Sequence, residues 1–141
     1  MAVNDLYETM GLVRIVEMSV EKGAVLEYEA RAEQCHSGGV VQGGFVTGWI
    51  DAAMAHAAIA ICGEEKVPMT LELKVSFLAP VRPGRLLAEG WAVKHGHRTC
   101  FYEGAIRDLD GKLLAKASST ILLADRAKVE AASAAAMGAR Q

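Results

Sequence analysis

GGFVTGWIDAAMAHAAIAIC, residues 43–62, is the stretch of this sequence that decides the fold. Its apolar residues recur at spacings of three and four, from Val46 through Ile50 to Ile61, and it contains no proline. Gly63 follows it in the position of a C-terminal stop. The stretch therefore predicts a single helix of about five turns.

The segments on either side of this helix have the patterns of β-strands. Residues 12–34 alternate loosely between apolar and polar around a turn at Lys22-Gly23, which predicts a β-hairpin. Four further runs, at residues 69–81, 86–96, 98–110 and 112–124, are separated by turn-forming segments, and we expect them to form a meander. The order predicts an α+β fold in which a curved antiparallel sheet of about six strands wraps a long central helix.

Length and composition fit one domain spanning residues 1–141. The chain has 141 residues, of which 52% are hydrophobic and 23% charged, as is ordinary for a globular protein. We expect the core of the domain at about residues 10–124. The alanine-rich tail, about residues 125–141, favours a terminal helix that need not pack on anything.

Several classes of partner and cofactor are not expected from the sequence. The formal net charge of −2 gives no basic surface for nucleic acid. No run of about 18 uninterrupted apolar residues suggests a membrane span, and the N-terminus lacks the layout of a signal peptide, so we expect a cytoplasmic protein. The cysteines at 35, 62 and 100 are far apart, which predicts neither a disulfide framework nor a metal site.

Asp51 is the one formal charge in the helical stretch. An isolated aspartate in an amphipathic helix usually lies on a solvent-facing stripe. That stripe here would carry no Lys, Arg or Glu, although exposed helix faces normally carry several. Because burying a lone carboxylate is costly, we interpret Asp51 as a functional residue.

The glycines that begin the helix offer a partner for this carboxylate. Backbone N–H groups in a first turn lack intrahelical acceptors, so Gly43 can hold a carbonyl oxygen that becomes an oxyanion. Asp51 lies eight residues further on, about 12 Å along the same helix, so one chain cannot place both on one reacting atom. The small residues 44, 48, 52 and 55 form a strip that would let a second helix approach, which predicts a dimer with shared sites.

Three segments resemble a known family. HSGGVVQGGFVTGWID, residues 36–51, resembles the signature of hotdog-fold acyl-CoA thioesterases, and within these the phenylacetate-pathway (PaaI-like) subfamily. TLELKVSFLAPVRPG, residues 70–84, and RDLDGKLLAK, residues 107–116, continue the similarity in the same order and spacing. The resemblance covers about residues 10–124.

The resemblance implies a hotdog fold and a homodimer, assembling to a homotetramer, that hydrolyses an acyl-CoA thioester at the dimer interface. It implies no cofactor, since coenzyme A is part of the substrate. Asp51 takes the position of the catalytic general base or nucleophile, and Gly43 that of the oxyanion-hole amide. His36 stands where Asn is common and would help to place the water or thioester. Gln42 replaces a commoner His, and Thr70 matches an assisting hydroxyl.

Other residues are candidates for substrate binding. Gly44 shares the first turn with the predicted oxyanion amide. Trp49 and Met54 could line an acyl pocket, with core packing as the alternative. His95 and Arg98 belong to a basic hairpin turn that could bind coenzyme A phosphates, although such turns are usually only solvated.

Two alternative functions share the expected fold. A hotdog acyl-CoA dehydratase or hydratase would use His36 as the base and Asp51 as the acid, but the loop around the histidine lacks the prolines of such enzymes. A non-catalytic acyl-CoA-binding protein would not need a catalytic carboxylate. Asp51 therefore favours hydrolysis over both.

Overall fold

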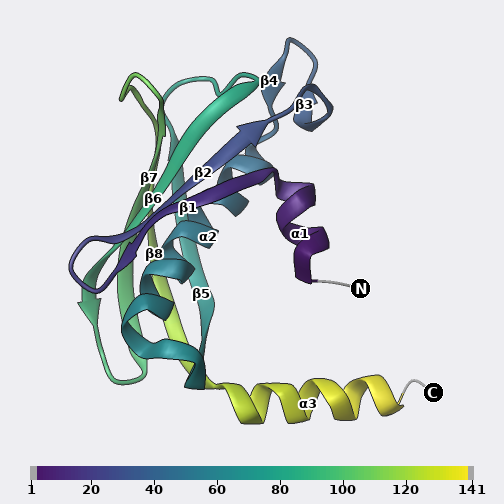
Figure 1. Ribbon diagram of the computed structural model, residues 1–141, viewed down its shortest axis with the longest axis vertical. Coiled ribbons are helices and arrows are strands. Elements are labelled where there is room, and N and C mark those ends of the chain that lie inside the picture. Colours follow the sequence, from purple (N-terminus) through teal and green to yellow (C-terminus); the bar gives the residue numbers. More distant parts are fainter. Residues whose placement is uncertain (1–2, 140–141) are drawn as a thin grey trace.

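The computed structural model describes residues 3–139 and has one long helix lying across a curved sheet (Figure 1). The elements in chain order are α1 (Val3–Met10), β1 (Leu12–Ser19), β2 (Gly23–Ala30), a 3₁₀ turn (Ala32–Gln34), β3 (Cys35–His36), β4 (Val40–Val41), α2 (Gly43–Cys62), a second 3₁₀ turn (Gly63–Glu65), β5 (Lys66–Phe77), β6 (Gly84–His95), β7 (Thr99–Asp108), β8 (Leu113–Asp125) and α3 (Arg126–Ala139). The predicted hairpin, central helix and four later strands are all confirmed.

The central helix α2 begins and ends where the sequence predicts. Gln42 is its N-cap, and the side-chain oxygen of Gln42 accepts a hydrogen bond from the Gly44 N–H. At the other end Gly63 has a φ of 71°, and its N–H donates to the carbonyl of Ile59. The face that includes Trp49 and Ile50 is fully buried against the sheet, so this face supplies the centre of the core.

The six long strands form one antiparallel sheet in the order β1-β2-β6-β7-β8-β5. The expectation of a four-strand meander is therefore wrong for β5, which pairs with β8 at the edge of the sheet. The connection from β5 to β6 holds Pro80 and Pro83, and its Val81 carbonyl accepts from the N–H of Val41 outside the sheet. Because β8 is its one neighbour among the described strands, β5 keeps one free edge.

Two glycines on adjacent strands allow α2 to pack closely against the sheet. Gly90 of β6 and Gly104 of β7 are directly paired. A Cβ atom at Gly90 would lie 2.5 Å from the carbonyl oxygen of Ala53, and one at Gly104 would lie 2.9 Å from Ile50 Cγ1. Only residues without side chains allow the helix backbone this close to the strands.

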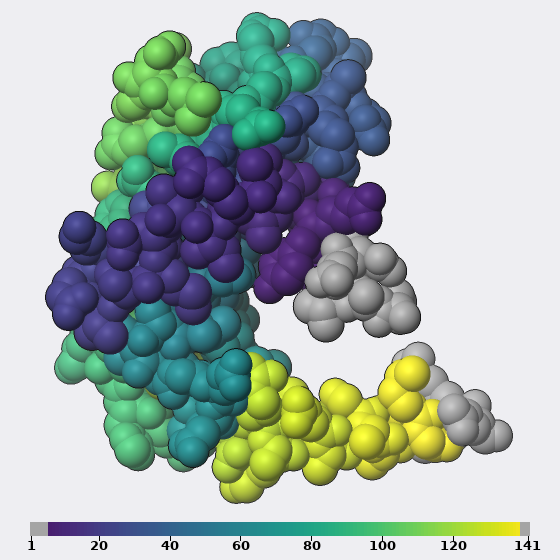
Figure 2. All heavy atoms as spheres, in the orientation of Figure 1, coloured from purple at the N-terminus to yellow at the C-terminus, as the bar shows by residue number. Residues whose placement is uncertain are grey.

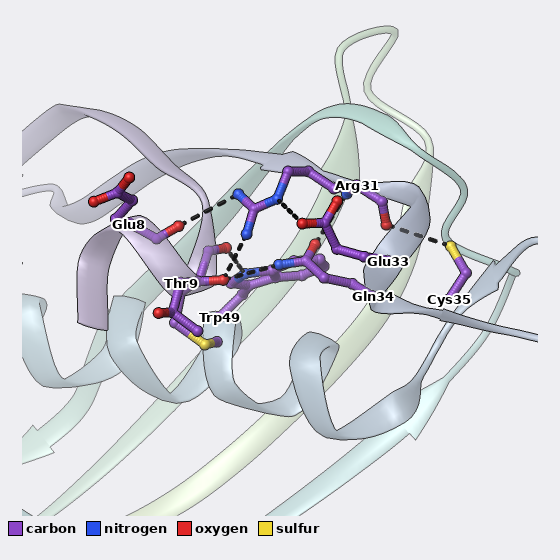
Figure 3. Close-up of polar contacts among 8 residues, drawn as sticks. Glu8, Thr9, Arg31, Glu33, Gln34, Cys35 and Trp49 are labelled. Carbon is purple, nitrogen blue, oxygen red and sulfur yellow. Dashed lines mark hydrogen bonds and ion pairs between the residues drawn. The ribbon is translucent and has the colours of Figure 1, made fainter. Parts of the chain in front are cut away.

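The N-terminal helix α1, which the sequence reasoning did not predict, is held by its last carbonyl groups (Figure 3). The Arg31 guanidinium and the Gln34 amide both donate to the Thr9 carbonyl, at 2.9 and 3.1 Å. The indole N–H of the fully buried Trp49 donates to the Met10 carbonyl at 2.8 Å. These three donors satisfy the C-terminal carbonyls of α1, which have no partners within the helix.

Two further expectations concern α2 and the tail. By length and composition Gly43–Glu65 could cross a membrane, although Asp51 interrupts its apolar run, and in the structure the buried face of α2 packs against the sheet. The predicted tail helix is confirmed as α3, which projects away from the other elements (Figures 1 and 2). Residues 140 and 141 lie outside the described residues.

Candidate active site

Asp51 and Thr70 form a direct contact between α2 and β5. The Thr70 hydroxyl donates a hydrogen bond of 2.7 Å to Asp51 Oδ1. Asp51 is half-buried and Thr70 is exposed, so the pair lies at the surface beside the free edge of the sheet. A charge-assisted hydrogen bond of this kind holds the carboxylate in one orientation and leaves its second oxygen open to a ligand.

In the first turn of α2, the N–H groups of Gly43 and Gly44 differ in whether they have a hydrogen-bond acceptor. Gln42 Oε1 accepts from the Gly44 N–H at 2.8 Å. Among the residues that the structure describes, the Gly43 N–H has no acceptor. Because Gln42 is exposed and caps the helix through its oxygen, its side-chain NH₂ remains able to donate beside Gly43. Two donors are thus available for a carbonyl oxygen here.

His36 lies next to this turn and lines a cavity of about 370 Å³ together with Gly43. Its Nδ1 is 2.8 Å from the Ser37 carbonyl oxygen, so Nδ1 carries the proton of that hydrogen bond. In the neutral ring Nε2 is then an acceptor. The rest of the cavity lining is apolar and comes from β4, α2, the end of β5 and the β5–β6 connection: Val40, Val41, Val46, Phe77, Leu78, Ala79, Pro80 and Val81.

The predicted catalytic residues therefore fall into two groups on one chain. His36, Gln42 and Gly43 gather at the start of α2, whereas the Asp51–Thr70 pair lies about 12 Å further along the helix. Both groups lie beside β5. Thr70 is near the middle of that strand, and the Phe77 ring at its end would be 3.3 Å from a Cβ atom at Gly43.

The small-residue strip is partly occupied by the chain itself. A Cβ atom at Gly48 would lie 2.7 Å from Met10 Cε, and one at Gly44 would lie 2.6 Å from Gln42 Oε1. The N-terminal helix α1 thus covers the position where a partner helix was expected to approach. The sequence predicted no element for the first ten residues, so the contact of Met10 with Gly48 was not expected.

The predicted acyl-pocket residues Trp49 and Met54 belong to the core. Both side chains have 0% exposure, which leaves no surface for a substrate. Trp49 packs near Tyr28, with ring centroids 5.7 Å apart, and the hydroxyl of the buried Ser119 lies 3.3 Å from Met54 Sδ. The alternative of core packing is the one that the structure shows.

His95 and Arg98 lie at the β6–β7 hairpin, away from the two groups above. His95 Nδ1 is 2.6 Å from the hydroxyl of the buried Tyr102, and partial burial lowers the pKa of His95. Burial also raises the pKa of Tyr102, so Tyr102 stays neutral and able to donate to the ring. The Arg98 side chain is exposed. Neither residue lines the cavity beside Gly43.

A second cavity, of about 670 Å³, lies between α1 and the start of α2. It is lined by Glu8, Thr9, Arg31, Glu33, Gln34 and Phe45, none of which was predicted as a site residue. Its polar groups are those that hold α1 in place (Figure 3). The docking of α1 thus accounts for the polar lining of this larger space, and the candidate active site remains the one at α2 and β5.

Comparison with known proteins gives a consistent result. Residues 38–115 match the model of the thioesterase superfamily. A protein of Saccharolobus solfataricus named "Putative esterase SSO2140" is 35% identical over 115 residues, covering 81% of each chain. The crystal structure of a phenylacetic acid degradation-related protein from Ralstonia eutropha aligns with a TM-score of 0.78 at 29% identity, covering 86% of this chain and 92% of that one. A Haemophilus influenzae thioesterase shares the fold, with a TM-score of 0.78 at 20% identity.

This chain belongs to the thioesterase superfamily and has the hotdog fold. It is a thioester hydrolase, and the predicted class of enzyme is confirmed. The family match spans Gln42, Gly43, Asp51 and Thr70, whereas His36 lies two residues before it.

Proposed function

We propose that this enzyme hydrolyses acyl-CoA thioesters to the free acid and coenzyme A, at sites that two chains of a homodimer share. The observation that carries the proposal is the division of the catalytic groups along one helix. The free Gly43 N–H and the Asp51–Thr70 pair are about 12 Å apart, too far to act on one carbonyl within a single chain.

The free edge of β5 supports the assembly of such a dimer. Met69, Leu71 and Phe77 on this strand are 43–62% exposed, which is unusual for large apolar side chains on an edge. The other edge strand, β1, has two register shifts in eight residues, whereas β5 has one in twelve, between Thr70 and Glu72. Antiparallel pairing of two β5 strands would bring the part of one strand that holds Thr70 toward the Phe77 end of the other.

The shared site then contains all the parts of a hydrolase. The Gly43 N–H and the Gln42 amide of one chain bind the thioester oxygen and stabilise the oxyanion. Asp51 of the other chain takes a proton from water as the water attacks the carbonyl carbon. The carbon–sulfur bond breaks when the tetrahedral intermediate collapses, and the leaving sulfur takes that proton from Asp51 and departs as the free thiol. His36 Nε2 can accept a hydrogen bond from the water or from the amide groups of the substrate.

Release of free thiol from a panel of acyl- and aryl-acyl-CoA thioesters tests the proposal. We expect Asp51→Ala to lower kcat by about 10² or more, because it removes the general base. Asp110→Asn, which removes an exposed carboxylate from the β7–β8 turn, is the matched control and should leave kcat unchanged. Full activity in a folded Asp51→Ala protein, or hydration of crotonyl-CoA without thiol release, would contradict the proposal.

Mixed dimers test whether the site is shared. Asp51→Ala and Gly43→Val proteins should each be inactive alone. A heterodimer of the two has one site with both native groups, so random mixing should restore about a quarter of the wild-type rate. No recovery after verified subunit exchange would show that each site is built within one chain.

A further inference from the structure

A cationic cavity of about 490 Å³ adjoins the cavity beside Gly43. The two share Pro80 and Val81 of the β5–β6 connection. The cationic cavity is lined further by Arg82, Pro83, Gly84, Arg85, Leu86, Asp108, Lys112 and Leu114. A ligand leaving the apolar cavity at Val81 would thus meet charged side chains next.

Three turns from distant parts of the sequence meet at this end of the molecule. Figure 2 shows the turn after β3 (blue), the β5–β6 connection (teal) and the β7–β8 turn (green) at the same end. Arg82 Nη1 donates to the Gly38 carbonyl at 3.4 Å, and Arg82 and Lys112 line the same cavity. The two cations therefore lie in the cavity next to the one that His36 and Gly43 line.

The charged groups of this cavity differ in whether they already have partners. Arg85 forms ion pairs of 2.8 Å with both Glu27 and Glu29, so its charge is compensated. Within the described residues no carboxylate forms an ion pair with Arg82 or Lys112. Asp108 also faces the cavity, but its Oδ1 accepts from the backbone N–H groups of residues 110 and 112, which closes the β7–β8 turn.

We propose that the apolar cavity beside Gly43 holds the pantetheine arm of coenzyme A, and that Arg82 and Lys112 bind its phosphate groups. This inference rests on the proposed function and names the binding site for one half of the substrate. A slender arm suits an apolar passage, and phosphates suit unpaired cations at its exit. An apolar acyl chain would gain no favourable contact in a passage that leads to charged side chains. The acyl group therefore lies on the opposite side of the reacting carbonyl.

This location differs from the basic hairpin at the β6–β7 turn, which the sequence offers as a candidate. His95 is tied to Tyr102 at the β6–β7 hairpin, and Arg98 lies three residues further along. Neither residue lines the cationic cavity beside Pro80 and Val81. Arg98→Gln therefore represents the competing location in the experiment.

The test compares two thioesters of the same acyl group, one of coenzyme A and one of N-acetylcysteamine, which has no phosphates. We expect Arg82→Gln and Lys112→Gln each to raise KM for the acyl-CoA about tenfold with kcat within twofold, since each removes a charge-assisted contact. The N-acetylcysteamine thioester should be hydrolysed at the wild-type kcat/KM. Lys22→Gln, which removes an exposed lysine from the β1–β2 turn, should change neither substrate.

Unchanged KM for acyl-CoA in both variants, or an equal loss with both thioesters, would overturn the inference, as would a rise in KM with Arg98→Gln alone. Calorimetric binding of free coenzyme A to the wild type and to Arg82→Gln gives a readout that needs no turnover. If the wild type hydrolyses no thioester, the proposed function fails. Weaker binding of coenzyme A to Arg82→Gln would still support the phosphate site, and equal binding would refute it.

Discussion

Replacing Thr70 by Val tests how the enzyme positions its carboxylate. The change is nearly isosteric and removes the hydroxyl that donates to Asp51 Oδ1 at 2.7 Å. Hydrogen bonds to charged groups contribute about 1.5–3 kcal/mol, and because Thr70 is exposed we take the lower end of that range. About 1.5 kcal/mol corresponds to a loss in kcat of about tenfold. KM should stay within twofold, and Thr70→Ser should recover most of the rate because it retains the hydroxyl.

The double variant decides whether Thr70 acts through Asp51. Asp51→Asn should lower kcat by about 10²–10⁴. If Thr70 only orients the carboxylate, adding Thr70→Val to Asp51→Asn should change kcat less than twofold, since no carboxylate remains to be oriented. Steady-state thiol release on folded proteins measures both values. A further tenfold loss in the double variant would refute this reasoning and place Thr70 in contact with the substrate.

Three other substitutions test the fold and assembly. Gly90→Ala should lower the free energy of unfolding by about 2 kcal/mol in urea titrations, because its Cβ would lie 2.5 Å from the Ala53 carbonyl oxygen. Unchanged stability would contradict the close packing of α2 against Gly90. Hydrogen bonds from Arg85 and Arg14 hold the pKa of Glu27 below its usual value, so the stability that the ionised group provides is present above about pH 4.3 and is lost as pH falls through the lowered pKa. Melting curves of Glu27→Gln should lose that acid-dependent step, and an identical pH profile would exclude the role. Leu71→Lys should dissociate the β5 dimer in sedimentation experiments, whereas Val93→Lys, at 60% exposure against 62%, should not.

The sequence predicts best what depends on local periodicity. Helix α2 was bounded correctly because the spacing of Val46 and Ile50 and the stop at Gly63 act within one segment. Helix α1 was missed, although Leu6 and Met10 have helical spacing, because eight residues give a weak signal. The pairing of β5 with β8 depends on where a connection runs, which no strand pattern specifies, but two prolines in six residues argue against a hairpin there.

The candidate site was predictable in its residue types more than in its contacts. The contact between Asp51 and Thr70 joins residues 19 positions apart, so the resemblance to a family indicated it and periodicity could not. The cations Arg82 and Lys112 were overlooked because they lie in different turns, and a run of basic residues at the β6–β7 hairpin gave a stronger local signal. The sequence left Trp49 and Met54 open between an acyl pocket and the core, since an apolar helix offers no sequence mark of which face meets the sheet. The structure buries both.

The docking of α1 determines where a recombinant fragment of this enzyme can begin. The family match covers residues 38–115, but the buried indole of Trp49 finds its acceptor at Met10 and the buried Gln34 amide finds its acceptor at Thr9. A fragment cut to the matched segment would also lack β1 and β2. Even one that begins at Leu12 would leave two buried donors without partners. A fragment that keeps the helix preceding the sheet avoids this loss of stability.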